Sequence, residues 1–114
     1  MWNLADVATY KSGERNNLNA PCSASSSYST QTCENAFNGI MTGGNSWSCD
    51  WNVQQPTYWI EWKSPAADTI KIWQSGHEHS RATLTYAGKT CQLELNGNGQ
   101  YIEFNLSEVC TAET

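Results

Sequence analysis

Positive charge is scarce in this 114-residue chain, which has six Lys and Arg against eleven Asp and Glu and a formal net charge of −5. Nucleic acids and anionic membranes attract proteins through basic patches, because lysine and arginine displace the counterions of the phosphates. Six scattered cations do not suggest such a patch. We therefore expect neither nucleic acid nor an anionic membrane as a partner.

Long apolar runs are lacking as well. A spanning helix needs about 18 consecutive apolar residues, and no stretch of the sequence offers them, so we do not expect membrane insertion. Met1 directly precedes Trp2-Asn3-Leu4, without the charged and apolar regions of a signal peptide. A secreted form of this chain would already have lost its signal.

Catalytic motifs are also missing. The sequence has no Gly-x-Ser-x-Gly elbow of a serine hydrolase. A glycosidase needs two facing carboxylates, for which Asp50 and Glu78 could be imagined. A single domain of this size leaves little room for a substrate cleft, so we predict that the protein is not an enzyme.

Five cysteines occur, but no Cys-x-x-Cys pair, which makes a zinc ribbon or a thioredoxin-type motif improbable. So many cysteines in a short chain favour an oxidising, extracellular compartment. Several pairings are compatible with the spacing; we favour Cys22–Cys33, closing a serine-rich loop, and Cys91–Cys110. Cys49 is then the odd thiol, expected to be exposed in a loop. Its partner could lie outside this chain, it could form an interchain disulfide, or it could be catalytic.

Helix signals are nearly absent, and only residues 33–40 suit a short helical turn. Residues 16–32 are polar and predict a loop. The remaining chain alternates apolar and polar residues in short runs separated by turns, which predicts one all-β domain, a sandwich or barrel. The expected strands are residues 4–10, 57–62, 69–74, 82–86, 91–95 and 100–106.

Two details of strand pairing can be predicted. Asn96-Gly97-Asn98-Gly99 joins the last two strands, and Asn-Gly is a strong hairpin signal. Residues 107–114 are turn-like, so no further strand returns to the first one. Residues 4–10 are therefore expected to have an open edge, which a partner chain could cover.

Three motifs, in order, resemble the discoidin or coagulation-factor type C domain, a galactose-binding-like family that includes the F-type lectins. They are Asn3-Leu4-Ala5, Asn35-Ala36-Phe37-Asn38-Gly39 and Gln55-Pro56-Thr57-Tyr58-Trp59-Ile60-Glu61-Trp62, followed by Ile70-Lys71-Ile72. The resemblance implies a jelly-roll β-sandwich over residues 1–114 that lacks its last strand. It also implies a sugar- or surface-binding module without catalysis, with its ligand site on loops at one end.

Carried over by position, the ligand loops are residues 45–54 and 75–81. The fucose-binding pattern has a His in the first loop and a pair of Arg in the second, whereas this chain has only Arg81. The calcium turn of the family corresponds to Asn35 and Asn38. Asn38 replaces an Asp, so a calcium site here would be weak.

The six tryptophans supply candidate ligand contacts. A sugar site needs an aromatic plane and a few fixed donors and acceptors. Trp47 and Trp51 could stack on a sugar or simply pack, whereas Trp59, Trp62 and Trp73 stand on strands and are expected to pack, Trp59 and Trp73 in the core. The candidate hydrogen-bonding side chains are Asp50, His77, Glu78, His79 and Arg81.

His77 and His79 allow other readings. Two histidines at i and i+2 on a strand could hold zinc or copper, or they could stand in a solvated loop.

The leading hypothesis is a secreted carbohydrate-binding module or lectin that recognises glycans or glycoproteins in several copies. The alternative is a structural or adhesion module that joins a partner chain, or a second copy, through an edge strand or through Cys49. A third hypothesis is phosphatidylserine binding with Trp47 and Trp51 as a wedge, which the acidic balance opposes.

Overall fold

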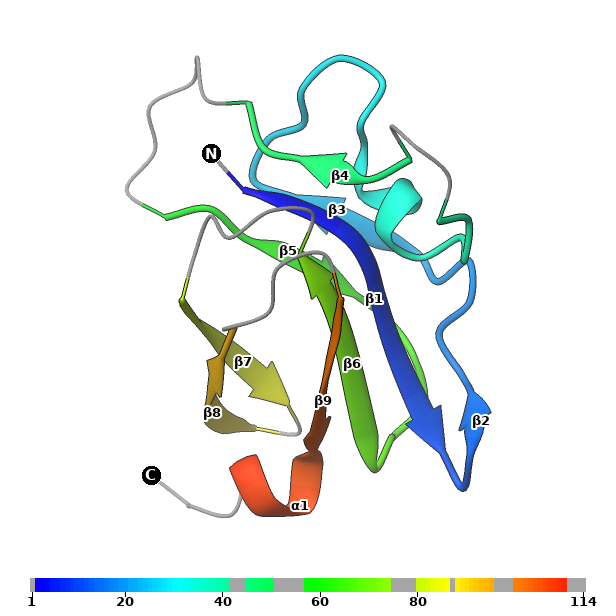
Figure 1. The fold of residues 1–114 in the computed structure, drawn as a ribbon, viewed down its shortest axis with the longest axis vertical. Helices are drawn as coiled ribbons and strands as arrows, with labels where there is room; N and C mark the ends of the chain where they lie inside the picture. Colours follow the sequence, from blue (N-terminus) through cyan, green and yellow to red (C-terminus); the bar gives the residue numbers. More distant parts are fainter. Residues whose placement is uncertain are drawn as a thin grey trace.

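The computed structural model describes residues 2–41, 45–50, 57–74, 80–86, 88–95 and 100–110 (Figure 1). These residues form antiparallel β-strands with only a 3-10 turn, η1 (Cys33–Ala36), and a short helix, α1 (Leu106–Val109). The prediction of an all-β chain is confirmed. In the described residues, no helix is long and apolar enough to cross a membrane.

The main sheet is built around β1 (Asn3–Lys11), the long blue strand of Figure 1. On one side β1 pairs with β6 (Thr69–Gln74), which pairs in turn with β9 (Tyr101–Asn105). On the other side β1 pairs with β2 (Glu14–Arg15) at one end and with β4 (Trp47–Ser48) at the other. The expected open edge at residues 4–10 is therefore wrong, because β1 is a central strand.

Side chains cover the middle of β1 on the side of β2 and β4. The Asn17 side chain accepts a hydrogen bond from the Thr9 N–H and donates one to the Val7 carbonyl. Arg15 donates to the same carbonyl. Since unpaired buried backbone groups are costly, these side chains take the place of a strand here.

The other strands form two separate antiparallel pairs. β3 (Cys22–Ala24) pairs with β5 (Ile60–Trp62), and β7 (Arg81–Tyr86) pairs with β8 (Lys89–Glu94). The expected hairpin between the last two strands is wrong, because β8 pairs with β7 and β9 pairs with β6. The tight turn instead follows β7, where Gly88 has a φ of 78°, a conformation that glycine adopts without strain.

The core lies between the main sheet and the two strand pairs. Along β8 the apolar Cys91 and Leu93 alternate with polar residues and are buried, whereas the buried residues of β6 are Ile70, Ile72 and Gln74. Trp73 lies on the opposite side of β6, half-buried against the ring of Tyr101, so its expected place in the core is wrong. The indole of Trp47 and the ring of Phe37 are the largest fully buried side chains of the core. Trp59, in contrast, is 44% exposed. Its expected place in the core is wrong, because Tyr58, Ile60 and Trp62 turn inward and Trp59 shares the outer side with Glu61.

Both favoured disulfides are present. Cys22–Cys33 joins β3 to η1, and Cys91–Cys110 joins β8 to the residue after α1. Cys49 is unpaired, as expected, but it is fully buried and its sulfur accepts the Trp2 N–H at 3.1 Å. The expected exposure of this thiol is wrong, and a buried sulfur cannot reach another chain to form an interchain disulfide.

Candidate functional site

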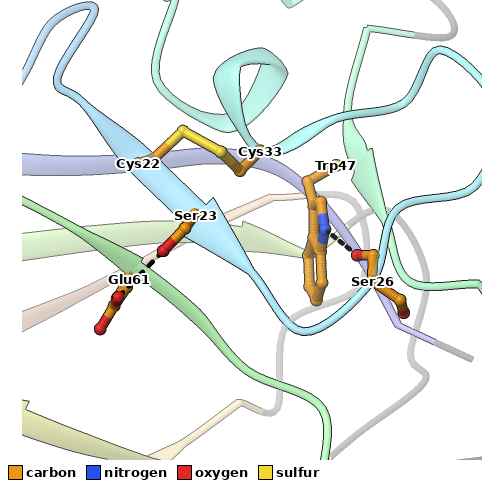
Figure 2. The surroundings of a disulfide bond; sticks show 6 residues. All are labelled: Cys22, Ser23, Ser26, Cys33, Trp47 and Glu61. Atoms are coloured by element: carbon orange, nitrogen blue, oxygen red, sulfur yellow. Dashed lines mark hydrogen bonds between the residues drawn. A yellow bond between two sulfur atoms is a disulfide. The ribbon is translucent and has the colours of Figure 1, made fainter.

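Trp47 does not serve as a ligand platform. It lies on β4 rather than in a loop, pairs with Leu4 of β1, and has no exposed surface. Its indole N–H donates to the Ser26 carbonyl at 3.0 Å, beside the Cys22–Cys33 disulfide (Figure 2). The candidate role of Trp47 in stacking on a sugar is therefore wrong, and the packing alternative is correct. A phosphatidylserine wedge that uses Trp47 is wrong for the same reason.

The other predicted site residues are distributed as follows. Trp51, His77, Glu78 and His79 lie outside the described residues. Asp50 is half-buried, and its N–H donates to the Ser26 hydroxyl at 3.0 Å. Arg81 begins β7 with a side chain that is 69% exposed. Its Nε lies 3.9 Å from an Oε2 of Glu94 on β8, a loose surface pair that leaves the guanidinium in contact with water.

The residues from which the two predicted ligand loops start lie at the same end of the main sheet. Leu4 pairs with Trp47 on one side and with Gln74 on the other. Trp2 adds a link, since its indole N–H donates to Oε1 of Gln74 at 2.8 Å. The starting points of both loops are therefore neighbours, and the meeting of the loops themselves stays a prediction.

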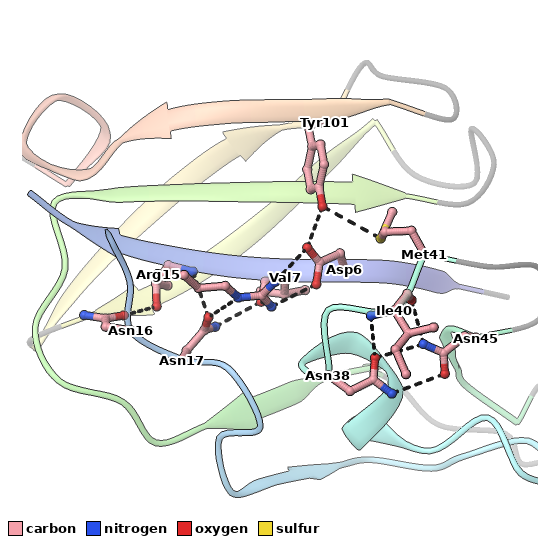
Figure 3. Close-up of polar contacts among 11 residues, drawn as sticks. Asp6, Val7, Arg15, Asn16, Asn17, Asn38, Ile40, Met41, Asn45 and Tyr101 are labelled. Carbon is pink, nitrogen blue, oxygen red and sulfur yellow. Dashed lines mark hydrogen bonds and ion pairs between the residues drawn. The ribbon is translucent and has the colours of Figure 1, made fainter. Parts of the chain in front are cut away.

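The two asparagines of the predicted calcium turn hold loops together. Nδ2 of Asn35 donates to the carbonyls of Thr30 and Ser46. Oδ1 of Asn38 accepts one hydrogen bond from the Ile40 N–H and another from Nδ2 of Asn45, as Figure 3 shows. Calcium would have to displace these donors from Asn38, so the site stays a prediction with a competing structural role.

Two cysteines and a glutamate lie close together beside η1 and could be taken for a metal site. Among the described His, Cys, Asp and Glu, the one group of three close enough to share an ion is Cys22, Cys33 and Glu34. The two sulfurs of this group are joined to each other. A disulfide offers no thiolate, so this cluster is structural.

A charged network surrounds the buried carboxylate of Asp6 on β1 and includes side chains of β2 and β9. The guanidinium of Arg15 donates hydrogen bonds to both carboxylate oxygens of Asp6, at 2.9 and 3.2 Å (Figure 3). The Tyr101 hydroxyl donates to the same carboxylate at 2.7 Å. Partial burial, followed by the hydrogen bond to Asp6, raises the pKa of Tyr101 well above its usual range. The network joins three strands and pairs a carboxylate that would be costly to bury alone, so its evident role is structural.

The sequence did not predict the β5–β7 groove, which we define as the space between residues 57–67 and residues 81–86. Two adjoining cavities make it up, of about 740 and about 480 Å³. They share five lining residues, which are Trp59, Ile60, Trp62, Thr83 and Leu84. The groove depends on a separation between two strands that are distant in sequence, so no local pattern could reveal it.

The smaller cavity combines an aromatic rim with polar groups and an apolar floor. Trp59 stands at the rim together with Arg81, Thr83 and Gln92, whose strand positions are exposed. Thr83 and Gln92 are cross-strand neighbours, with Oγ1 and Oε1 3.4 Å apart. The floor is formed by apolar residues of the main sheet and of β8, namely Leu4, Val7, Ile70, Ile72 and Leu93.

This arrangement combines groups that can bind a ligand. A half-exposed indole that lines the same cavity as a guanidinium, a hydroxyl and an amide offers one apolar plane and several hydrogen-bonding groups. Arg81 alone among the predicted ligand contacts that the structure describes lines this cavity. Compared with known proteins, the chain has no significant match to any protein-family model, curated protein or solved structure.

Proposed function

We propose that this chain is a non-catalytic carbohydrate-binding domain whose ligand lies on the rim of the β5–β7 groove at Trp59 and Arg81. The observation that carries the proposal is that the exposed indole of Trp59 and the exposed polar side chains of Arg81, Thr83 and Gln92 line the same cavity. Sugars present apolar C–H faces and many hydroxyls, which suit this combination. Trp59 thus takes the stacking role that Trp47, being buried, cannot have.

The wider setting supports an extracellular binding module. Two disulfides in a short chain suit an oxidising compartment, and we propose that the domain is secreted. The resemblance to discoidin-type domains supports a jelly-roll connection of the strands. Calcium stays a weaker proposal at Asn35 and Asn38, because Asn38 is already held by N–H donors.

Sugar titrations with the intact chain test the glycan proposal. The probes are methyl glycosides of galactose, fucose, mannose and N-acetylglucosamine, followed by calorimetry and tryptophan fluorescence. We expect one of them to bind weakly, because a single shallow rim buries little of a ligand. Trp59→Ala and Arg81→Ala should each weaken binding about tenfold or more, equivalent to about 1.4 kcal/mol, without lowering the melting temperature by more than a few degrees.

Thr90→Ala provides the matched control. Thr90 is exposed on β8, near the same face, but it lines neither cavity. Its substitution should leave sugar binding unchanged. The proposal fails if no glycoside binds to the folded protein, or if Thr90→Ala weakens binding as much as Arg81→Ala.

A further inference from the structure

The β5–β7 groove separates two strand edges. β5 pairs with β3 and β7 pairs with β8. In the part of the chain that the structure describes, neither strand has a partner on its other edge, and these edges border the groove. Each therefore presents the half of its backbone N–H and C=O groups that a neighbouring strand would use.

A side chain rather than a backbone bridges the far end of the groove. The Tyr86 hydroxyl donates to the Ala67 carbonyl and accepts the Ala67 N–H, both at 2.8 Å. These are the two groups that a paired strand would satisfy. Because the link is a full tyrosine side chain, β7 and the segment after β5 stand too far apart for direct pairing, which needs a spacing of about 4.8 Å.

The lining residues of the two cavities give the relative direction of the strands. On these two segments, residues 57–60, Trp62 and residues 81–84 line the smaller cavity, and residues 59–67 and 83–86 line the larger one. Residue numbers increase in the same direction on both sides, so β5 and β7 run parallel to each other. Every described strand pair of this molecule is antiparallel. One strand between β5 and β7, antiparallel to both, would continue this pattern.

The side chains of both edges indicate the chemistry of that strand. Ile60 and Trp62 on β5, and Leu84 and Tyr86 on β7, turn inward but remain only half-buried. Glu61, Thr83 and Thr85 alternate with them and are exposed. An inserted strand would therefore place apolar residues inward over this floor and polar residues outward.

Charge selects one outward position. Glu61 is exposed on the outer side of β5 and accepts the Ser23 hydroxyl from β3 at 2.9 Å. The whole chain is acidic, with a net charge of −5. Glu61 is the one acidic residue among the described residues that line the two cavities, and this lining also includes Lys63 and Arg81. A cationic residue opposite Glu61 would form a favourable cross-strand pair.

We propose that the β5–β7 groove accepts an extended segment of a partner polypeptide as an added strand that joins the β3–β5 and β7–β8 pairs into one sheet. The segment runs antiparallel to both edges, spans about five residues, alternates apolar and polar side chains, and carries Lys or Arg opposite Glu61. In such β-augmentation, backbone hydrogen bonds provide affinity and alternate side-chain pockets provide specificity. The inference does not rest on glycan binding, because it is argued from the free strand edges. The added strand would lie beside Trp59 and Thr83, so the peptide and a sugar are expected to compete for the groove.

Blocked peptides test the strand directly. The probe is the acetylated, amidated peptide Thr-Val-Lys-Val-Thr-Val-Ser, titrated into the intact chain and followed by calorimetry and amide hydrogen exchange. We expect saturable binding with slower exchange in β5 and β7. Neighbouring N–H groups of a strand point to opposite edges. Two further peptides carry N-methyl groups, one at the odd-numbered residues and the other at the even-numbered residues. Each should bind tenfold or more weakly, because each lacks the hydrogen bonds to one of the two edges.

A charge exchange serves as the second test and does not depend on a mutation in the core. Glu61→Lys should weaken binding of the lysine peptide about tenfold and restore binding to a peptide with Glu in place of Lys. Glu108→Lys, on an exposed position of α1 that lines neither cavity, is the control and should change neither affinity.

Three outcomes would overturn the proposal. One is that only one of the two N-methylated peptides binds more weakly, since the peptide would then add to a single edge. Another is slower exchange at β9, the outer strand of the main sheet, in place of β5 and β7. The third is a dimer, seen by sedimentation without peptide, in which β5 and β7 are already protected, since the occupant would then be a second copy of this chain.

Discussion

Trp47 and Trp59 have opposite surroundings and should respond oppositely to substitution. Trp47 is fully buried and donates to the Ser26 carbonyl, whereas Trp59 is 44% exposed. Trp47→Ala should lower the free energy of unfolding by about 3–5 kcal/mol, the usual cost of truncating a buried Trp. Trp59→Ala should cost about 1 kcal/mol or less. Urea unfolding of both variants measures the difference, and equal losses would contradict the packing described above.

The sequence indicated that tryptophans would fill the core but not which ones. In Tyr58-Trp59-Ile60-Glu61-Trp62 the alternation has two possible phases, and large apolar residues stand on both. Glu61 decides the phase, because an unpaired carboxylate is costly to bury. Trp47 gave no strand signal, since the two residues of β4 form a strand only through their pairing with β1.

At the scale of the elements, Asp68 links the ends of β1, β6 and α1. Its carboxylate should make the stability of the fold depend on pH. Its carboxylate accepts the Ser12 N–H, just after β1, and the Thr69 hydroxyl on β6, while its carbonyl accepts the Leu106 N–H of α1. The bond from Ser12, followed by that from Thr69, lowers the pKa of Asp68. A lowered pKa contributes stability above the unfolded value of about 3.9, and this contribution is lost as the pH falls through the folded value.

Asp68→Asn should therefore lower the melting temperature at pH 7, and the difference from the unmodified chain should shrink below about pH 4. Thermal unfolding between pH 3 and 7 measures this. Glu103→Gln is the control, because Glu103 is exposed and lies 3.8 Å from Lys71, a surface pair that contributes little. A difference for Asp68→Asn that stays constant across this range would contradict the role of its charge.

The elements themselves were predicted better than their partners. Strands near residues 69–74, 82–86 and 91–95 are present, because alternation is a local property. The Asn-Gly signal at residues 96–99 predicted a hairpin, but burial of Cys91 and Leu93 places β8 beside β7. Partner choice depends on which inward faces meet across the core, and this is also why the β5–β7 groove could not be predicted.

At the scale of the whole molecule, the β7–β8 pair has no strand pairing with the main sheet in the described residues, and Cys91–Cys110 is its covalent link to the end of α1. The bond closes a loop of 19 residues, which the chain-entropy estimate values at about 3 kcal/mol. Replacing both cysteines with alanine should lower the free energy of unfolding by about this amount and increase hydrogen exchange in β7 and β8 more than in β1 and β6.

The matched control replaces Cys22 and Cys33, whose loop spans 11 residues. It should cost a similar free energy but leave the exchange of β7 and β8 closer to that of the intact chain, because Cys22–Cys33 ties β3 to η1 on the other side of the groove. Equal exchange of β7 and β8 in the two variants would contradict a separate attachment of this strand pair.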